Sequence, residues 1–511
     1  MRAKPLWSRP VAKRPTSTLR SYAGHTAQAE LCIAADENDV RHALLRAKSA
    51  GRLVAFRAGG LSFDTQALSH DLSVSLERLT QIHVDKATAT VTVGAGARWK
   101  DILARTSQEG LLPYVLVTTG EATAGGTLSS HSISRFSPTL GREGRHVSRI
   151  RLLLPDGTVR CCSRTENPEL FSAAIGGFGY FGAILEITYR LFRAPVSGSH
   201  IGVETVFEKL TSVAELVERL VPDAPGACEA VGASDDPWSD ARALTGVLYL
   251  RGGRRSLLST SRYVDRRHDR GAPSVFHRPR SPGHLALQFM AQVGPLRDVG
   301  YRATFGRGFR EPRRHLDELT GYTFFQDGNL IFRKLGWRAG LAMGIRQQTY
   351  MLPCDPSDRA SCKAMLELFL DEAETIVRRQ GLLPALIDVL YVPADDEFLL
   401  SSSRGLPSLA ITFTFERLAS AKLAAEEQVC RELCSLCAEV GGRVHLVKHV
   451  FADPGLVPRM YREVAEEAAL LRRRVGAHGV LTNEFLDRTL GLNDIEPRLE
   501  QQGDRRMLRS A

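Results

Sequence analysis

The fold is decided by one stretch, Val54-Ala-Phe-Arg-Ala-Gly-Gly-Leu-Ser-Phe-Asp64. A strand-like apolar run ends at Arg57, and two adjacent glycines follow at once. Because glycine has no Cβ atom, Gly59 and Gly60 let the backbone turn sharply and aim several N–H groups at one point, where phosphate oxygens can bind. Arg57 adds a charge and Ser62 adds a hydroxyl. A Gly-Gly pair after a strand is more often a plain turn, so this interpretation needs support from the rest of the chain.

Two more glycine-rich passages supply that support. Thr118-Thr-Gly-Glu-Ala-Thr-Ala-Gly-Gly-Thr-Leu-Ser-Ser-His131 mixes small and hydroxyl residues and predicts neither a good helix nor a good strand. Ile175-Gly-Gly-Phe-Gly-Tyr-Phe-Gly-Ala-Ile184 precedes an expected strand at 185–191. Bare backbone of this kind lets a large planar ligand lie close to the chain. None of the passages is a G-x-G-x-x-G that opens a βαβ unit or a Walker loop, so a classical Rossmann domain is disfavoured.

Short strands and helices are expected around these passages. Asp36 caps a helix that Gly51 ends, with apolar residues on one face. Pro155-Asp-Gly157 predicts a hairpin turn between two strands. Further strands are expected at 31–34, 53–56, 72–76, 82–85 and 88–93, and helices at 99–109 and just after Asn167.

Composition sets the bounds on function. The 511 residues, 43% hydrophobic and 24% charged, are enough for two or three globular domains. The net charge of +10 favours anionic partners, but a phosphate-bearing ligand explains it as well as nucleic acid does. No basic helix interleaved with aromatic residues occurs, so we expect no nucleic-acid partner. Residues 1–24 read as a basic arm, with a transit peptide as the alternative. We expect no transmembrane segment and a cytoplasmic protein.

Nine cysteines in a chain of this length indicate thiols and not a disulfide scaffold. Cys430, Cys434 and Cys437 fall on one helical face, with His445 and His449 downstream. The spacing between the two groups is too short for a typical zinc site, so a buried helical stripe is the favoured interpretation and no metal is expected.

Taken together, residues 25–195 resemble the FAD-binding domain of the vanillyl-alcohol oxidase and p-cresol methylhydroxylase flavoprotein family. The residues that carry the resemblance are Arg57-Ala-Gly-Gly-Leu-Ser62, Val91-Thr-Val-Gly-Ala-Gly96, Thr123-Ala-Gly-Gly-Thr-Leu-Ser129, Leu153-Leu-Pro-Asp-Gly157 and Gly177-Phe-Gly-Tyr-Phe-Gly-Ala-Ile184. The resemblance implies an α+β protein in which FAD lies between two small subdomains. It implies a substrate (cap) domain with an antiparallel sheet at 196–430 and a C-terminal segment at 431–511 that returns to the flavin.

The resemblance also implies which residues meet the cofactor. The expected FAD-binding residues are Arg57, Ala58, Gly59, Gly60, Leu61, Ser62, Thr119, Gly120, Thr123, Gly125, Gly126, Thr127, Ser129, Ser130, Gly179, Gly182 and Ile184. Many family members carry a histidine where Leu61 stands, and that histidine bonds covalently to the flavin. A leucine cannot form this bond, so we expect non-covalent FAD, with His131 an improbable substitute.

The C-terminal part resembles two subfamilies, the decaprenylphosphoryl-ribose oxidases and the delta-24-sterol reductases. The similar residues are Gly441–Val450, Pro454–Tyr461, Val475–Leu481, Phe485-Leu486 and, for the oxidases, Met343–Pro353. The match at 200–330 is poor, and the arginine-rich stretch Arg251–Arg280 reads as a solvated loop, with a phosphate or lipid-headgroup contact as the alternative. The oxidases carry a further lysine where this chain reads Asp388-Val-Leu-Tyr-Val392, which weakens any claim to the same substrate.

Lys448 is the leading catalytic candidate, because it matches the lysine of the oxidase C-terminal segment and is expected mid-strand. In a buried flavin pocket it acts either as a base with a lowered pKa or as a cation beside the flavin. Tyr350, Gln347 and His131 are second-rank candidates for orienting the substrate.

Three hypotheses follow. The first is an FAD-linked oxidase or dehydrogenase that takes a hydride from a CH–OH carbon of a sugar-like or secondary-metabolite substrate. An anionic or lipid-linked substrate is compatible with this hypothesis. Oxygen, a quinone or another acceptor would then reoxidise the flavin. The second is a reductase of a carbon–carbon double bond that uses NAD(P)H. The third is a non-catalytic FAD-fold or nucleic-acid-binding protein.

Overall fold

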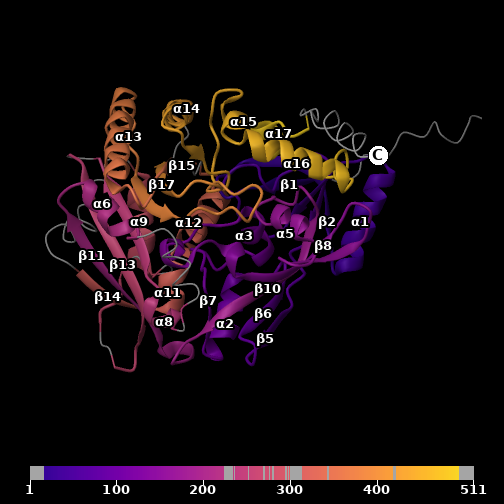
Figure 1. The fold of residues 1–511 in the computed structure, drawn as a ribbon, viewed down its shortest axis with the longest axis horizontal. Helices are drawn as coiled ribbons and strands as arrows, with labels where there is room; N and C mark the ends of the chain where they lie inside the picture. The colour runs from indigo at the N-terminus through magenta and orange to yellow at the C-terminus, as the bar shows by residue number, and fades with distance from the viewer. Residues whose placement is uncertain are drawn as a thin grey trace, which may run out of the picture.

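The computed structural model describes residues 16–493 except for internal gaps at 224–233, 235, 251–252, 269–270, 275–276, 279–280, 294–295, 297–298, 300–312, 342–343 and 418–421. Three β-sheets with their helices make up this part of the chain (Figure 1). Most of the basic arm expected at 1–24 lies outside the described residues. The two smaller sheets come from residues before 195 and the large antiparallel sheet from residues after 200, which is the predicted α+β arrangement.

The first sheet has the strand order β1-β2-β4-β3. Its strands are β1 (Ser17–Arg20), β2 (Thr26–Ile33), β4 (Leu72–Ser75) and β3 (Val54–Arg57). β4 pairs in parallel with both β2 and β3. The helix α1 (Glu37–Ser49) begins where Asp36 accepts a hydrogen bond from the Asp39 amide, as predicted, and it buries its apolar face on the sheet.

The second sheet has the order β5-β6-β10-β8-β9, with β7 paired to β10. Its strands are β5 (Ile82–Asp85), β6 (Thr90–Gly94), β10 (Ala183–Arg193), β8 (Val147–Leu153), β9 (Val159–Cys162) and β7 (Leu111–Pro113). The helices beside it are α2 (Trp99–Gln108) and α5 (Pro168–Ala174), with a 3₁₀ turn at Glu143–His146, whereas α4 (Ser137–Leu140) lies against the third sheet described below. The predicted hairpin turn joins β8 to β9.

The second glycine-rich passage corrects one prediction. Residues Ala124–Ser130 form a short helix, α3, where neither helix nor strand was expected. The cause is tertiary packing: the Gly125 amide donates to the Ala95 carbonyl at 2.9 Å, and a Cβ at Gly125 would lie 2.7 Å from the Ala95 Cβ. The missing side chain that lowers helix propensity is therefore what lets this helix dock on the strand.

The third sheet is antiparallel and has the order β14-β11-β13-β12-β16-β17-β15-β18. Its strands are β14 (Arg313–Glu318), β11 (Ile201–Leu210), β13 (Arg255–Asp265), β12 (Ala243–Tyr249), β16 (Leu386–Val392), β17 (Ser408–Arg417), β15 (Gly344–Pro353) and β18 (Arg443–Val444). One face is covered by α6 (Ala214–Leu220), α13 (Arg359–Arg379) and α14 (Leu423–Glu439), and Figure 1 shows the last two lying over β15 and β17. The cysteine stripe of α14 is buried there, as predicted.

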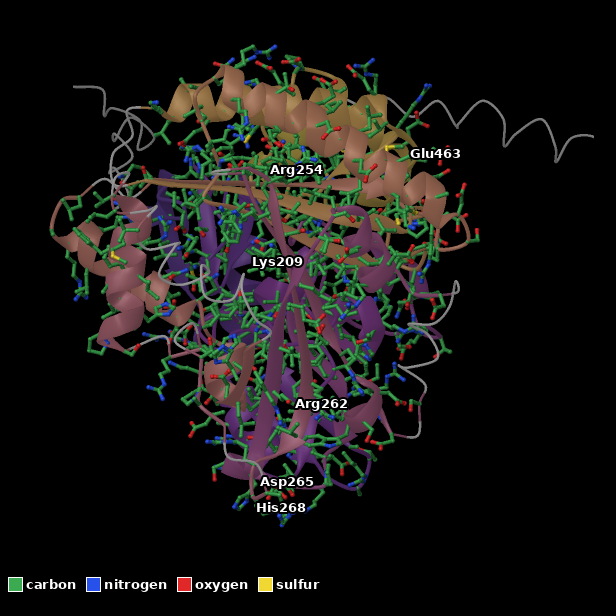
Figure 2. All side chains as sticks on the ribbon, turned by 90° about the vertical axis from the view of Figure 1, so that its left-hand side faces the viewer. Lys209, Arg254, Arg262, Asp265, His268 and Glu463 are labelled. Atoms are coloured by element: carbon green, nitrogen blue, oxygen red, sulfur yellow. The ribbon has the colours of Figure 1, made fainter. Side chains whose placement is uncertain are left out.

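The expectation of a solvated loop at Arg251–Arg280 is wrong for its central part. β13 runs through this stretch and pairs along its length with β11 and β12. Alternation explains the miss, because buried leucines and serines face the neighbouring layers while Arg262 reaches the surface and pairs with Glu204 at 2.6 Å. Figure 2 shows Arg254 and Asp265 at opposite ends of this strand.

Smaller helices complete the described chain: α8 (Pro237–Asp240), α9 (Pro282–Gln292), α11 (Leu319–Thr323), α12 (Asp327–Arg338), α15 (Leu456–Met460), α16 (Arg462–Arg474), α17 (Glu484–Leu490) and a 3₁₀ turn at Gly198–His200. None of the helices in the described ranges is long and apolar enough to cross a membrane.

The C-terminal helices return to the first two sheets. Leu481 bridges Val54 beside β3, and the Arg472 guanidinium donates to the Tyr180 carbonyl at 2.7 Å. The Asn483 amide nitrogen donates to the carbonyls of Gln66 and Phe178 at 2.9 and 3.0 Å. The last described segment therefore packs against the region formed by the first two sheets.

Candidate functional site

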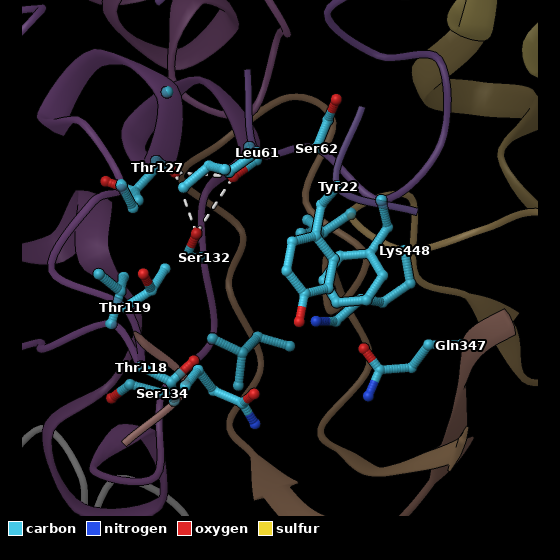
Figure 3. A pocket seen from close by; sticks show the side chains of 18 of the residues that line it. Tyr22, Leu61, Ser62, Thr118, Thr119, Thr127, Ser132, Ser134, Gln347 and Lys448 are labelled. Atoms are coloured by element: carbon cyan, nitrogen blue, oxygen red, sulfur yellow. Dashed lines mark hydrogen bonds between the residues drawn. The ribbon is translucent and has the colours of Figure 1, made fainter. Parts of the chain in front are cut away.

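A cavity of about 600 Å³ lies between the glycine-rich loops and one face of the large sheet. We call its two sides the loop wall, formed by residues 57–63, 118–135 and 178–184, and the sheet wall, formed by the cavity-facing residues of β12, β15, β16 and β17 with residues 445–448. Figure 3 shows Thr118, Thr119 and Thr127 on one side of the cavity and Gln347 and Lys448 on the other.

The loop wall gathers the predicted cofactor residues. All of them line the cavity except Gly120, whose amide instead donates to Asp327 at 3.0 Å. The three passages are far apart in the sequence, and the sheets bring them together at the ends of β3, β6 and β10. The geometry is therefore compatible with the prediction that these residues share one site.

The first glycine pair has free donors. Within the described residues, the amides of Gly60, Leu61 and Ser62 have no hydrogen-bond acceptor, so their N–H groups are available to an anion. Gly60 has φ +65°, and a Cβ there would collide with the Arg57 guanidinium. A Cβ at Gly59 would press on the Glu121 carbonyl at 3.3 Å. This cradle fits the pyrophosphate of FAD.

Arg57 holds the loop and does not stand free in the cavity. Its guanidinium donates to the carbonyls of Ala67 at 3.1 Å and Arg20 at 3.0 Å. The Ser62 hydroxyl likewise donates to the Asp64 carbonyl at 3.3 Å. Both residues line the cavity, but their observed bonds shape the backbone that would bind the phosphate.

The sheet wall is polar because of strand alternation. Every second residue of four strands faces the cavity: Thr245 and Val247, Ile345, Gln347 and Thr349, Leu386, Asp388 and Leu390, and Ala410, Thr412 and Thr414. The apolar residues between them face the helices on the other side of the sheet and belong to the largest hydrophobic cluster. One face of the sheet is thus core, and the other presents hydroxyl, amide and carboxyl groups.

Lys448 lies on the cavity, but not mid-strand as predicted. β18 ends at Val444, and the chain then bends because the Gln66 side-chain amide donates to the carbonyls of Leu446 and Lys448 at 3.0 and 2.9 Å. The Lys448 Nζ lies 3.8 Å from the ring centroid of Phe63 on the loop wall. Burial lowers the pKa of Lys448 to about 8, although the Asp388 charge opposes this effect.

Asp388 is the residue that the sequence reasoning missed. In the sequence, this position is informative only because it lacks the lysine of the oxidases. In the structure, Asp388 faces the same cavity from β16. Burial raises its pKa to about 6, against the charges of Lys448 and Arg135. A usable signal existed, because a lone acid between Leu386 and Leu390 on one face of an apolar strand is costly unless something pairs with it.

Tyr350 does not reach the cavity. It follows Thr349 on β15, so its side chain faces the opposite side of the sheet, where its hydroxyl donates to the Cys430 carbonyl of α14 at 3.1 Å. The second-rank candidate Gln347 does line the cavity, with its amide nitrogen 2.9 Å from the Thr414 hydroxyl.

His131 is also outside the cavity lining. It ends α3 with φ 48°, and its Nε2 lies 2.6 Å from Asp395 Oδ2 in a buried pair beside Phe398. Burial lowers the pKa of His131 to about 4 despite this carboxylate. The Arg142 guanidinium donates to the His131 carbonyl and to Ser401, so the residue ties the loop wall to the chain after β16.

A second histidine–aspartate pair does reach the cavity. His277 lines it, with Nδ1 2.7 Å from Asp317 Oδ2, and Asp317 also accepts the Ser274 amide at 2.9 Å. Burial lowers the pKa of His277 against the pull of Asp317. Arg135 lies nearby over the rings of Tyr322 and Phe325, at 4.0 and 4.8 Å. No sequence motif marks these residues.

Much of the loop wall belongs to the part of the chain that is similar to known proteins. Residues 29–163 match the FAD binding domain family, so FAD is the cofactor that this part of the chain binds. An uncharacterized oxidoreductase, ORF5 in the fasciation locus of Rhodococcoides fascians, is 32% identical over 157 residues, which cover 30% of this chain and 36% of that one.

Two plant proteins match to a similar extent. Cytokinin dehydrogenase 2 of Arabidopsis thaliana is 31% identical over 169 residues, 33% of each chain, and cytokinin dehydrogenase 8 of Oryza sativa subsp. indica is 36% identical over 140 residues, 27% of this chain and 26% of that one. The matched part spans between 26% and 36% of the length of these three relatives. They differ from the two subfamilies that the C-terminal residues resemble, so the comparisons support the FAD-binding domain and neither subfamily.

Proposed function

We propose that this chain, built on an FAD-binding domain, is an FAD-dependent oxidoreductase that takes a hydride from the CH–OH carbon of a small, hydroxyl-rich molecule. One observation carries the proposal. The cavity that the cofactor loops line is closed on its other side by a polar sheet face with a lysine and an aspartate. The cofactor and a polar reacting group would therefore meet in one enclosed volume.

FAD, when bound, supplies a two-electron acceptor. The protein's part begins with the loop wall, where the free amides of Gly60 to Ser62 bind the pyrophosphate and the bare backbone near Gly125 and Gly179 permits close approach. The polar sheet face then orients the substrate, and Lys448, as an ammonium group, stabilises negative charge that develops in the cavity.

Hydroxyl groups on the sheet wall favour a hydroxyl-bearing substrate. Thr349 and Thr412 share a hydrogen bond of 2.8 Å, and Thr414 accepts one from Gln347. Each of these threonine hydroxyls keeps further donor or acceptor capacity, because a hydroxyl has one donor and two lone pairs. Such a surface binds several hydroxyl groups at once, as a sugar-like molecule requires.

Oxidation at a carbon–nitrogen bond is the second candidate. Two of the relatives reported above are named cytokinin dehydrogenases, and that name points to a substrate other than a simple alcohol. In this chain, Asp388 supplies a carboxylate that would accept a hydrogen bond from a substrate N–H. The two candidates thus differ in the reacting heteroatom and share the site.

The test begins with the visible spectrum of the purified protein before and after acid precipitation. A yellow protein that releases its flavin to the supernatant supports both the cofactor and the prediction from Leu61. Anaerobic mixing with xylitol, sorbitol and benzyl alcohol, and separately with benzylamine and NADPH, then identifies the reductant. Bleaching by an alcohol supports the proposal, bleaching by benzylamine alone supports the second candidate, and bleaching by NADPH alone supports a reductase.

A further inference from the structure

The cavity holds two opposite charges that do not touch. Lys448 and Asp388 each influence the pKa of the other, yet among the ion pairs of the described residues none joins them. Within the described residues, neither the Asp388 carboxylate nor the Lys448 ammonium has a hydrogen-bond partner in the protein. Both side chains are half-buried and line the cavity, so a polar group of a ligand that lies between them would complete the hydrogen bonds of both.

The backbone fixes where that group would bind. Asp388 is on the central strand β16, opposite Val247 on β12 and Thr412 on β17. Strand alternation aims its side chain at the cavity, and the neighbours on both sides are uncharged. Arg135 of the loop wall is the other cation that acts on it. The carboxylate is thus rigidly placed, with its open side toward the substrate volume.

Lys448 is held from two directions. The Gln66 amide fixes its backbone carbonyl, and the ring of Phe63 lies under its ammonium group. Its Nζ is therefore positioned by the loop that carries the cofactor cradle, whereas Asp388 is positioned by the sheet. The two charged groups of the sheet wall are thus held by different parts of the chain and open to the same cavity.

Resting on the function proposed above, we propose that Asp388 is the general base that removes the proton of the reacting substrate hydroxyl, while Lys448 binds the same oxygen as a hydrogen-bond donor. The substrate C–H bond breaks and its electron pair leaves with the hydrogen as hydride to FAD, which is reduced. The O–H bond breaks, its proton passes to an Asp388 oxygen, and the remaining electron pair forms the carbonyl of the oxidised product.

The protonation states agree with these roles at neutral pH. With a pKa of about 6, Asp388 is mostly a free carboxylate, and with a pKa of about 8, Lys448 is mostly an ammonium ion. The reverse assignment, with Lys448 as the base, requires the lysine to lose its proton beside a carboxylate that favours keeping it. A base near pH 6 and an acid near pH 8 give a bell-shaped rate profile.

His277 is the rival base, because it also faces the cavity and Asp317 orients it. The two assignments separate by substitution. Asp388→Asn removes the charge that acts on Lys448, whereas His277→Gln leaves that charge in place. The test therefore includes both variants and one control, Glu367→Gln, which removes a carboxylate from the exposed side of α13.

The first measurement needs no substrate. Lysines of the holoenzyme are dimethylated with ¹³C-formaldehyde, and their NMR signals are followed with pH, with Lys448→Ala assigning the relevant signal. We expect the pKa of Lys448 to fall by about 1 pH unit in Asp388→Asn and to stay unchanged in Glu367→Gln and His277→Gln. An unchanged pKa in Asp388→Asn would overturn the pairing of the two groups.

The second measurement is anaerobic flavin reduction in stopped flow, with the alcohol among xylitol, sorbitol and benzyl alcohol that bleaches fastest. Asp388→Asn should keep its FAD, lose about 10²- to 10⁴-fold in rate, and lose the rise in rate through about pH 6. Asp388→Glu should keep that rise. A wild-type profile in Asp388→Asn, or loss of the rise only in His277→Gln, overturns the assignment. If none of the alcohols bleaches the flavin, the proposed oxidation and the base role fail together, whereas the NMR result stands by itself.

Discussion

The loop wall and the sheet wall face the same cavity but present different chemical groups to it. The loop wall is backbone: glycines, free amides and short side chains that leave room for a ligand. The sheet wall is side chain: single polar groups on alternate positions of four strands and on one bend. The first kind of surface suits a cofactor shared by many proteins, and the second sets which molecule is brought to it.

The largest effect is expected where backbone alone makes the site. Gly60→Val should abolish FAD retention, because Gly60 has φ +65° and any side chain there meets the Arg57 guanidinium. Gly51→Val is the matched control, since Gly51 has φ +64° and a Cβ added there would meet no atom within 4 Å. The readout is flavin absorbance per protein after purification. A fully yellow Gly60→Val would show that the loop wall does not depend on bare backbone.

On the sheet wall we expect loss of reaction with retention of cofactor. Lys448→Ala should bind FAD normally and slow flavin reduction by the substrate by at least about 10²-fold, because the cavity loses its ammonium group. Lys86→Ala, at an exposed ion pair with Glu109, is the control. Equal rates in Lys448→Ala and the wild type would mean that the Lys448 ammonium group has no part in flavin reduction.

The link between the walls should affect stability more than chemistry. Asp395→Asn should lower the free energy of unfolding at pH 7 by about 1–3 kcal/mol, because it replaces the carboxylate that accepts the hydrogen bond of the buried, neutral His131 ring. Burial would raise the pKa of Asp395, but the charge and hydrogen bond of His131, with Arg142, lower it to about 2. The stabilisation is therefore present above about pH 4 and lost as pH falls through 2.

Urea unfolding of the wild type and Asp395→Asn at pH 7 and pH 2 measures this difference. We expect the gap between the two proteins to close at the lower pH. A gap of the same size at both values would assign the stabilisation to packing and not to the charge.

The smallest effect tests where the walls touch. Phe63→Leu removes the ring under Lys448 and should lower the pKa of Lys448 by less than about 1 unit, with FAD content unchanged. The ¹³C-methyl signal of Lys448 reports it. A rise in this pKa would contradict a stabilising contact between the ring and the ammonium group.

The sequence predicted the secondary structure around the loop wall well because its signals are local. Glycine pairs, an Asp36 cap and a Pro-Asp-Gly turn each act over a few residues, and the structure bears out these elements. α3 was missed because its docking on Ala95 depends on a residue about 30 positions earlier, which propensity does not register.

The sheet wall was predicted poorly because register decides it. Tyr350 and Gln347 are three residues apart on β15, and only the parity of the strand places one in the core and the other in the cavity. Asp388 and Lys448 come from segments that meet only in the fold. His277 and Asp317 lie in the region of weakest resemblance, where no motif guided the prediction.

The bridge between Val54 and Leu481 affects how the chain folds during its synthesis. About 430 residues separate these two positions, so β3 leaves the ribosome long before its final neighbour exists. At roughly 5–20 residues per second, the nascent cofactor region waits about 20 to 90 seconds for its closing segment. Over that interval the edge of β3 is accessible to chaperones, and FAD that arrives early meets an incomplete binding site.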